Sequence, residues 1–455
     1  MSPEARIAEV TIGSPWEYEL WMVGGCVRDP LLGEPTSPDI DIVLEGDSAK
    51  LARWLFKRGI SEIAPVIYSR FGTALVRVAG VNVEIASART ESYAPQSRKP
   101  TVRTATLEQD ALRRDFTINT LFRNLHTGEL FDVTGMALAD IRDRVLRTPL
   151  DPALTFRDDP LRMLRAVRFK NRFNLSPVPE LWSAISKEAH RLEVVSLERI
   201  RDEFSKMLLH KTAGQALVDL LDCGLLKEFA PELVRMVNVE QGSYHSKDVW
   251  GHTLDVIENS SRATLEGGGE RLNLMLASLL HDVSKPETRT VEADQRVRFF
   301  GHERIGARTA ARFLRKLRFP QKTVRAVSQL VANHMRLGSA VPFTQPAARR
   351  LIRDMGELTD LLVLLVECDA KAVGRVEKGI DFAHVRAQLS SVTTEGPKSE
   401  LESPLSGEEI MAELNCGPGP TVGKAKRMLL NAVLDGNLGG GDKQAALELL
   451  RQTFH

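Results

Sequence analysis

Val23-Gly24-Gly25-Cys26-Val27-Arg28-Asp29 is followed shortly afterwards by Ser37-Pro38-Asp39-Ile40-Asp41-Ile42-Val43-Leu44, and together these two stretches are the most informative feature of the chain. The apolar residues around the two acids predict a buried strand. Residues i and i+2 of a strand project from one face, so Asp39 and Asp41 would present two carboxylates side by side. Two like charges held that close are costly unless a cation lies between them, and Mg²⁺ prefers oxygen ligands.

The glycine pair that precedes this strand adds a second feature to the same region. Gly24 and Gly25 let the backbone come close to a phosphate, and Arg28 can supply a positive charge. A lone Asp-x-Asp is usually solvated, and a lone Gly-Gly is usually only a turn. Their occurrence within one short window favours a site for a nucleoside triphosphate and one or two metal ions.

Length and composition limit the class of protein. A chain of 455 residues is too long for one compact core and predicts three or four units. Four scattered cysteines without a Cys-x-x-Cys pair indicate neither a zinc knuckle nor a disulfide framework, so we expect a reducing compartment. The chain also lacks an apolar signal segment and any apolar stretch of about 18 residues. We therefore expect a soluble, cytoplasmic protein without membrane association.

Local charge is uneven although the formal net charge is only +1. Between Arg304 and Arg325 there are eight Lys or Arg residues and no acid. From Ile141 to Lys170 there are eight basic residues against four acids. Such clusters can follow a phosphate backbone, and solvated helix faces are an equally good explanation of either one.

The first 150 residues have the pattern of a mixed α/β domain. Short β-branched runs at 73–78 and 81–85 alternate with helical segments such as 48–58. In the second run Asn82 and Glu84 share one face, so Glu84 is either an exposed strand acid or a third carboxylate of the site. After Pro149 apolar residues recur at three- and four-residue spacing, which predicts an all-helical remainder.

Several motifs in a fixed order resemble one family. They are Gly24 to Asp29 with Asp39-Ile40-Asp41, then Arg113-Arg114-Asp115-Phe116-Thr117-Ile118-Asn119, then Asp158-Asp159-Pro160-Leu161-Arg162-Met163-Leu164-Arg165-Ala166-Val167-Arg168-Phe169, then Glu198-Arg199-Ile200-Arg201-Asp202-Glu203. Together they resemble the class II tRNA nucleotidyltransferase and bacterial poly(A) polymerase family. The resemblance implies catalytic carboxylates at Asp39, Asp41 and Glu84, with Mg²⁺ held by the two aspartates. It also implies nucleotide-binding residues at Gly24, Gly25, Arg28, Arg113, Arg114, Asp115, Asn119, Asp159, Arg162 and Arg165.

The stretch around Asp159 predicts a helix that begins near this residue, with Pro160 at its first position. Arg162 then lies one turn on, which gives a hydrogen-bond acceptor beside a planar fork of donors. Such a pair can read the edge of cytosine or adenine, since both offer an amino donor and a ring-nitrogen acceptor. The alternative is that Asp159 only caps the helix and pairs with Arg162. Asp158 departs from the family, which more usually has glutamate there.

Residues 90–100 resemble the family's mobile loop, which is linked to switching from C addition to A addition. Members that add only C tend to have a shortened loop, and this one has full length. The resemblance therefore favours an enzyme that is able to add A.

A second group of residues suits a metal ion. An adjacent His-Asp pair, His281-Asp282, follows an apolar run, and His252 lies about thirty residues before it. This pattern resembles the HD phosphohydrolase family. The resemblance implies a divalent metal of unknown identity bound by His252, His281, Asp282 and Asp369, with His302 and His334 as ligands of a second ion. Either a phosphatase or cyclic phosphodiesterase acting on RNA ends, or an inert metal-stabilised RNA-binding domain, is compatible with it.

These features predict an α/β nucleotidyltransferase head, with a mixed sheet and helices, followed by an all-α body that includes an HD-type helical domain. The expected parts are a catalytic head at 1–150, a helical nucleotide-selecting neck at 151–235, an HD-like domain at 236–390, a Ser/Thr/Glu/Pro-rich linker at 391–405, and a helical tail at 406–455 that opens with a capping box at Ser406 and Glu409. The implied activity is template-independent addition of C, A or CCA to tRNA 3′ ends from CTP and ATP, with release of pyrophosphate.

Three other functions remain open at this point. Poly(A) polymerases share the head motifs, although the best-known members generally lack an HD segment. A metal phosphohydrolase with a degenerate head would leave Asp39, Asp41, Arg114 and Arg162 unexplained. A non-catalytic RNA-binding protein would explain the basic clusters but not the arrangement of the carboxylates. The nucleotide added, the HD substrate and the oligomeric state do not follow from the sequence.

Overall fold

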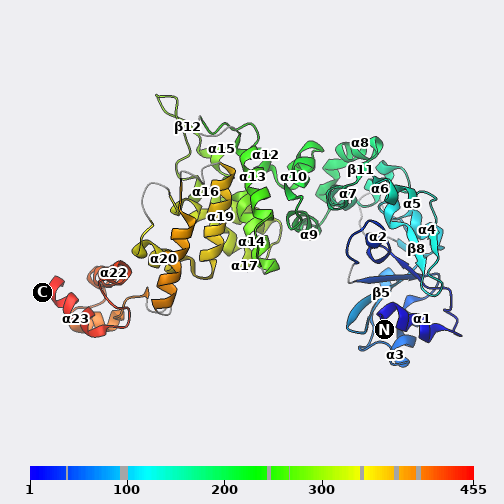
Figure 1. The fold of residues 1–455 in the computed structure, drawn as a ribbon, viewed down its shortest axis with the longest axis horizontal. Helices are drawn as coiled ribbons and strands as arrows, with labels where there is room; N and C mark the ends of the chain where they lie inside the picture. The colour runs from blue at the N-terminus through cyan, green and yellow to red at the C-terminus, as the bar shows by residue number, and fades with distance from the viewer. Residues whose placement is uncertain are drawn as a thin grey trace. The chain divides into compact units, whose positions relative to one another are not determined.

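The computed structural model describes residues 1–36, 39–92, 101–242, 247–265, 267–338, 343–373, 379–395 and 401–454. The chain forms two compact units, Met1–Val234 and Arg235–His455 (Figure 1). This division lies beside the expected end of the neck at residue 235.

A seven-stranded sheet forms the centre of the head, with strand order β3-β4-β5-β2-β1-β8-β9. The strands are β1 (Trp21–Val23), β2 (Ile40–Leu44), β3 (Val66–Tyr68), β4 (Thr73–Val78), β5 (Val81–Ser87), β8 (Leu121–Asn124) and β9 (Leu130–Asp132). β2 and β5 run parallel, while the other neighbours are antiparallel, so the sheet is mixed as predicted. Ile42 of β2 and Ile85 of β5 are almost fully buried and contribute to the core beneath the sheet.

Helices surround this sheet and then continue into the neck. In the head they are α1 (Pro3–Thr11), α2 (Gly25–Leu31), α3 (Ser48–Lys57), α4 (Leu107–Leu112) and α5 (Ala137–Arg142), with short 3₁₀ turns η1 (Ser69–Phe71) and η2 (Thr117–Asn119). The neck contains α6 (Pro152–Asp158), α7 (Leu161–Phe173), α8 (Pro179–Glu188), η3 (Ala189–Val194), α9 (Leu197–Leu208), α10 (Ala213–Asp222), α11 (Leu226–Phe229) and α12 (Pro231–Val234). A two-residue parallel pair joins head to neck, β10 (Val145–Leu146) with β11 (Ser176–Pro177).

The loop that resembles the family's switching loop lies mostly outside the described residues. Its flanks are described, and they form an antiparallel pair of strands, β6 (Arg89–Ser92) and β7 (Thr101–Thr104). The loop therefore leaves and re-enters the head at adjacent positions.

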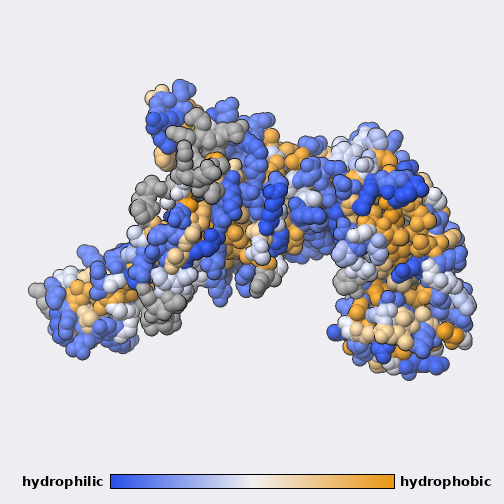
Figure 2. Space-filling view, viewed as in Figure 1, coloured by the Kyte–Doolittle hydropathy of each residue, from blue (hydrophilic) through white to orange (hydrophobic). Residues whose placement is uncertain are grey.

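Over its described residues, the second unit is helical apart from loops and one small antiparallel pair, β12 (Thr290–Val291) with β13 (Val297–Arg298). Its helices are α13 (Val249–Ser261), α14 (Gly268–Leu280), α15 (Lys285–Thr288), α16 (His302–Lys316), α17 (Gln321–Asn333), η4 (His334–Arg336), α18 (Gln345–Met355), η5 (Gly356–Leu358), α19 (Thr359–Ala372), α20 (Phe382–Glu395), α21 (Gly407–Glu413), α22 (Pro420–Asp435) and α23 (Lys443–Phe454). In the view of Figure 2, hydrophilic residues cover much of the surface over α13 to α19. The apolar faces of these helices pack inward.

Two features near the tail bear on the predicted organisation. The capping box at Ser406 and Glu409 is confirmed, because each side chain accepts a hydrogen bond from the other residue's backbone N–H. α20 extends to Glu395, so it takes in the first residues of the expected linker at 391–405, and Val392 gives this part of the helix a buried side chain. Among the described residues, no helix is both long and apolar enough for a membrane crossing.

Candidate functional site

The predicted carboxylates of the head meet through the pairing of two strands. Asp41 in β2 lies directly opposite Glu84 in the parallel strand β5. Directly opposed residues of neighbouring strands have side chains on the same face, and Asp39 immediately precedes β2. Burial and the charges of Glu84 and Asp39 raise the pKa of Asp41 to about 6, although Arg114 and Arg28 oppose the shift. The three acidic groups therefore act on one another electrostatically.

Gly24 explains how the chain passes so close to this group. Its φ of +78° is unfavourable for other residues, and a Cβ atom at this position would lie 3.1 Å from Oδ2 of Asp41. Gly24 is also the N-cap of α2, and Gly25 is the first residue of that helix. A group of neighbouring carboxylates that raises the pKa of Asp41, next to an open glycine turn, fits a divalent cation with oxygen ligands.

Arg28 lies inside the wall of the site and is only 6% exposed. Its Nε atom donates to Oδ1 of Asp29 at 2.8 Å, and its Nη1 atom donates to Oδ1 of Asn119. The guanidinium also lies over the rings of Phe169 and Phe173 of α7. Burial lowers the pKa of Arg28, against the effect of Asp29. The predicted phosphate-binding arginine thus links α2 to η2 and α7.

Arg113 and Arg114 share one buried partner that sequence reasoning missed. Nε of Arg113 donates to Oδ1 of Asp110 at 2.9 Å, and Nη2 of Arg114 donates to Oδ2 at 2.7 Å. Burial would raise the pKa of Asp110, but the two arginines lower it. Asp110 lies in α4, which begins with a capping box at Thr106, while Arg113 is the C-cap of this helix and Arg114 follows it. The spacing of i, i+3 and i+4 was the available signal.

Asp115 connects the head to the neck. Its Oδ1 accepts a hydrogen bond from Nδ2 of Asn119 at 2.8 Å, and its Oδ2 accepts one from Nε of Arg165 in α7 at 2.7 Å. Burial would raise the pKa of Asp115, but Arg165 and Asn119 hold it well below its usual range. The predicted residues Asp115, Asn119 and Arg165 therefore form one hydrogen-bonded network. Asn119 connects this network to Arg28.

Asp159 and Arg162 each have a partner other than one another in the part of the chain that the structure describes. Oδ1 of Asp159 accepts from the backbone N–H of Leu161, the first residue of α7, at 3.2 Å, while its Oδ2 accepts from Nη2 of Arg199 in α9 at 2.7 Å. Arg162 donates to the backbone carbonyl of Arg113. The expected helix start is one residue too early, because Pro160 is the N-cap of α7 and Leu161 is its first residue, while Asp159 is the C-cap of α6. Among the described residues, Asp159 and Arg162 do not pair with one another. Arg199, which lies in the fourth quoted motif, is the partner that the prediction lacked.

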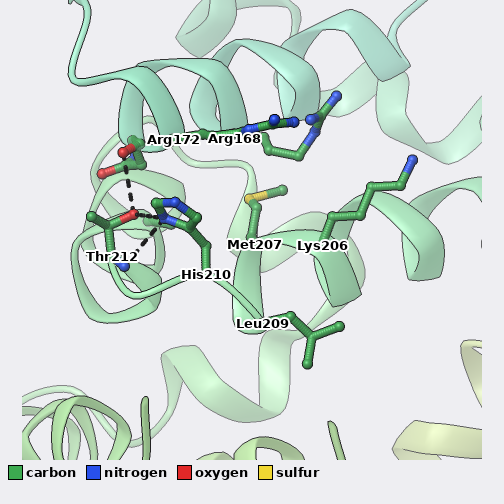
Figure 3. A pocket seen from close by; sticks show the side chains of 9 residues that line it. Arg168, Arg172, Lys206, Met207, Leu209, His210 and Thr212 are labelled. Atoms are coloured by element: carbon green, nitrogen blue, oxygen red, sulfur yellow. Dashed lines mark hydrogen bonds between the residues drawn. The ribbon is translucent and has the colours of Figure 1, made fainter. Parts of the chain in front are cut away.

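A basic cavity of about 440 Å³ lies in the neck between α7 and the segment that contains α9 and α10 (Figure 3). Arg168 and Arg172 face it from α7, opposite Lys206, Met207 and His210. The predicted site residues are not among those that line it. Its lining places basic side chains of the neck beyond the predicted nucleotide-binding residues.

The predicted metal ligands of the second unit converge through their Nε2 atoms. His252 Nε2 lies 2.9 Å from Oδ1 of Asp369, and His281 Nε2 lies 3.1 Å from Oδ2 of Asp282. His302 Nε2 lies 3.3 Å from Oδ1 of Asp282. The residues come from α13, from the turn after α14, and from α16 and α19. Helices remote in sequence thus bring these groups to one place.

The outer nitrogens of three histidines are held by backbone carbonyls. Nδ1 of His281, His302 and His334 lies 2.8, 2.8 and 2.7 Å from the carbonyls of Ser278, Phe299 and Val331. An Nδ1–H that donates in this way leaves Nε2 as a lone-pair donor, which is the arrangement of metal-bound histidine.

Two further observations fit a metal at this centre. Nε2 of His281 is buried and, apart from its 3.1 Å ion-pair contact with Oδ2 of Asp282, lacks a hydrogen-bond partner among the described residues. Burial and the neighbouring His281 lower the pKa of His334 to about 4, so its ring is neutral at neutral pH. Potential ligand atoms form two groups, His252 with His281 and Asp282, and Asp282 with His302 and His334. Imidazole and carboxylate groups in such a set suit a divalent transition metal.

Lys285 is a further residue of this centre that sequence reasoning missed. Its Nζ lies 2.6 Å from Oδ2 of Asp282 and 2.7 Å from Oε1 of Gln241. The spacing of three residues after Asp282 was the available signal, since one helical turn brings i and i+3 together.

Comparisons with known proteins agree with this geometry. Family models match a poly A polymerase head domain at residues 20–147, a probable RNA and SrmB-binding site of polymerase A at 174–236, and an HD domain at 249–371. The chain is 32% identical over 435 residues to a CC-adding tRNA nucleotidyltransferase of Thermus thermophilus, covering 94% of this chain and 92% of that protein. It is 33% identical over 348 residues to an A-adding tRNA nucleotidyltransferase of Deinococcus radiodurans, covering 73% and 76%.

The fold has a solved counterpart over almost its whole length. The CCA-adding enzyme of Bacillus stearothermophilus in complex with CTP has a TM-score of 0.67 and 23% identity, covering 99% of this chain and 98% of that one. The chain therefore belongs to the tRNA nucleotidyltransferase and poly(A) polymerase family and carries an HD domain in its second unit.

Proposed function

We propose that this chain adds C or A residues to the 3′ end of tRNA from CTP and ATP, in a reducing compartment such as the cytoplasm. The observation that carries the proposal is the register that places Asp41 opposite Glu84, beside Asp39 and the open turn at Gly24. The similarity to both a CC-adding and an A-adding tRNA nucleotidyltransferase supports it.

The roles of the head residues follow from their chemistry. Asp39 and Asp41 would hold Mg²⁺, which when bound lowers the pKa of the attacking hydroxyl and neutralises charge on the α-phosphate. Glu84 would orient the 3′-hydroxyl of the tRNA. The 3′-hydroxyl gives up its proton to the surrounding water and its oxygen forms a bond to the α-phosphorus. The bond from that phosphorus to the bridging oxygen breaks, and pyrophosphate leaves. Arg113 and Arg114 would contact the triphosphate, because guanidinium groups bind phosphate oxygens in pairs.

Base selection would belong to the start of α7. The carboxylate of Asp159 can accept a hydrogen bond from the amino group of cytosine or adenine, and the guanidinium of Arg162 can donate to the adjacent ring nitrogen. One pair of side chains serves both bases, since this part of their edges is alike. Arg199 and the Asp115–Arg165 network would hold the pair in position.

The test uses three tRNA transcripts, ending before CCA, after C and after CC, each with CTP, ATP or both. Extension of all three to CCA would establish a complete CCA-adding enzyme. Action on the first two with CTP alone, or on the third with ATP alone, would identify a CC-adding or an A-adding enzyme. Long A tails on unrelated RNAs would instead establish a poly(A) polymerase, and no extension of any RNA would refute the proposal.

A second activity is favoured by one specific observation, the convergence of imidazole Nε2 atoms and Asp282 in the HD domain. We propose that this centre binds a divalent transition metal and hydrolyses phosphoesters at RNA ends. The test is metal content by mass spectrometry together with hydrolysis of 2′,3′-cyclic nucleotides by the wild-type protein and an Asp282→Asn variant. Bound metal without hydrolysis would leave a structural metal site, and equal activity of both proteins would refute the assignment.

A further inference from the structure

A long part of the HD domain contains no acidic residue. Between Arg304 and Arg353 the sequence contains twelve Lys or Arg residues and neither Asp nor Glu. The first eight lie on α16, α17 and the turn between them, and every one is exposed: Arg304, Arg308, Arg312, Arg315, Lys316, Arg318, Lys322 and Arg325. This segment is the basic cluster for which the sequence left two explanations open.

Four of these arginines form a single line on α16, which we call the α16 stripe: Arg304, Arg308, Arg312 and Arg315. Their spacing of four, four and three residues places them on one helix face over about 16 Å. The other side of the helix is buried through residues such as Ala310, Phe313 and Leu314. The stripe is therefore fixed to the core of its unit and its charges face outward.

The α16 stripe differs from other exposed arginines of the same unit in its partners. Arg262, Arg296 and Arg298 form ion pairs with Glu258, Asp294 and Glu292. Among the described residues, no carboxylate lies within ion-pair distance of Arg304, Arg308, Arg312 or Arg315, and Arg312 contacts only the hydroxyl of Thr309 through a side-chain hydrogen bond. Like charges at i and i+4 destabilise a helix by a few tenths of a kcal/mol each, so the fold itself gains nothing from this arrangement.

We propose that the α16 stripe binds the sugar-phosphate backbone of tRNA away from its 3′ end. The identity of the RNA as tRNA rests on the proposed function. Phosphate fits the charge pattern, because guanidinium groups bind phosphate oxygens in pairs and RNA offers them at regular intervals. An anionic membrane fits less well, since the large apolar side chains of α16, Phe313 and Leu314, are buried in the domain.

The test compares two triple variants of the full chain that lose the same charge. The first is Arg308→Gln/Arg312→Gln/Arg315→Gln, which leaves the residues next to His302 unchanged. The matched control is Arg262→Gln/Arg296→Gln/Arg298→Gln, which removes exposed arginines that already have acidic partners. Dissociation constants for a tRNA transcript ending before CCA are measured at several salt concentrations, with circular dichroism to verify folding.

We expect the affinity of the stripe variant for tRNA at low salt to be lower by a factor of about ten or more. The slope of log affinity against log salt concentration should be shallower by about 2 to 3. The control should bind like the wild type, and extension at saturating tRNA should be unchanged in both. Equal affinities for all three proteins would overturn the inference. It would also be overturned if the stripe variant lost binding to anionic vesicles but kept wild-type binding to RNA. If the wild type binds tRNA through the stripe yet extends no RNA, the proposed function fails and the inference stands.

Discussion

Asp41 is the residue on which the proposed chemistry depends most directly. It lies opposite Glu84, and its carboxylate would hold the metal ion that activates the 3′-hydroxyl. We expect Asp41→Asn to lower the rate of nucleotide addition by about a thousandfold or more while tRNA affinity changes little, as measured by single-turnover extension and filter binding. Glu62→Gln, which removes an exposed acid of the same unit, is the control. Normal extension by Asp41→Asn would show that another group holds the metal.

The same substitution should make the protein more stable. Burial and the charges of Glu84 and Asp39 raise the pKa of Asp41 to about 6, so its ionised form is disfavoured in the folded state. Ionising Asp41 in the folded state therefore lowers the free energy of unfolding. This loss is absent below about pH 4, where the carboxyl is protonated in both the folded and unfolded states, and it is complete above about pH 6. Without divalent cations, Asp41→Asn should therefore raise the free energy of unfolding by about 1 to 3 kcal/mol at pH 7.5.

Denaturant titrations at pH 7.5 and pH 4, with and without Mg²⁺, measure this effect. The advantage of the variant should disappear toward pH 4, and Mg²⁺ should reduce it at pH 7.5 because only the wild type retains the full binding site. A variant that is less stable than the wild type at pH 7.5 would contradict the expected electrostatic cost.

At the scale of elements, the sequence predicted which strands carry the acids better than it predicted how they pair. The apolar residues around Asp39 and Asp41 predicted the strand β2, and the β-branched run at 81–85 predicted the strand β5. Their parallel register did not follow from the pattern, because β3, β4 and α3 intervene and pairing depends on the whole sheet.

Side-chain partners were the least predictable part of the site. Arg162 was expected beside Asp159 from helical spacing alone, but Asp159 pairs with Arg199 of α9 and Arg162 contacts the backbone of Arg113. Both contacts depend on how α9 and the loop before η2 pack against α7. Neighbours within one helix can be read from spacing, whereas contacts between elements require the tertiary structure.

Arg199 links two neck helices, and its loss should affect nucleotide choice more than the chemical step. In Arg199→Ala, Oδ2 of Asp159 loses its 2.7 Å partner, while the backbone of Leu161 still holds Oδ1. We expect discrimination between CTP and UTP, measured as the ratio of kcat/KM, to fall about tenfold, since one charge-assisted hydrogen bond contributes about 1.5 to 3 kcal/mol. Arg199→Lys should recover part of it.

The control for this prediction is Arg201→Ala on the same helix, because Arg201 forms an ion pair with its neighbour Asp202. Equal loss of discrimination in both variants would indicate a general effect of weakening α9. Unchanged discrimination in Arg199→Ala would remove Arg199 from the nucleotide-selecting network.

The whole molecule consists of two units whose proposed ligands differ, and this difference should be visible in thermal unfolding. Mg²⁺ with CTP would bind only to the first unit, and a transition metal would bind most tightly to the imidazole-rich centre of the second. A ligand that binds the folded form at a hundred times its Kd stabilises the unit that holds it by about 2.7 kcal/mol. Calorimetry should show at least two transitions, with CTP and Mg²⁺ raising one and Mn²⁺ raising the other. Asp282→Asn should cancel the Mn²⁺ shift and leave the CTP shift intact, whereas a single transition moved by both ligands would show that the units unfold together.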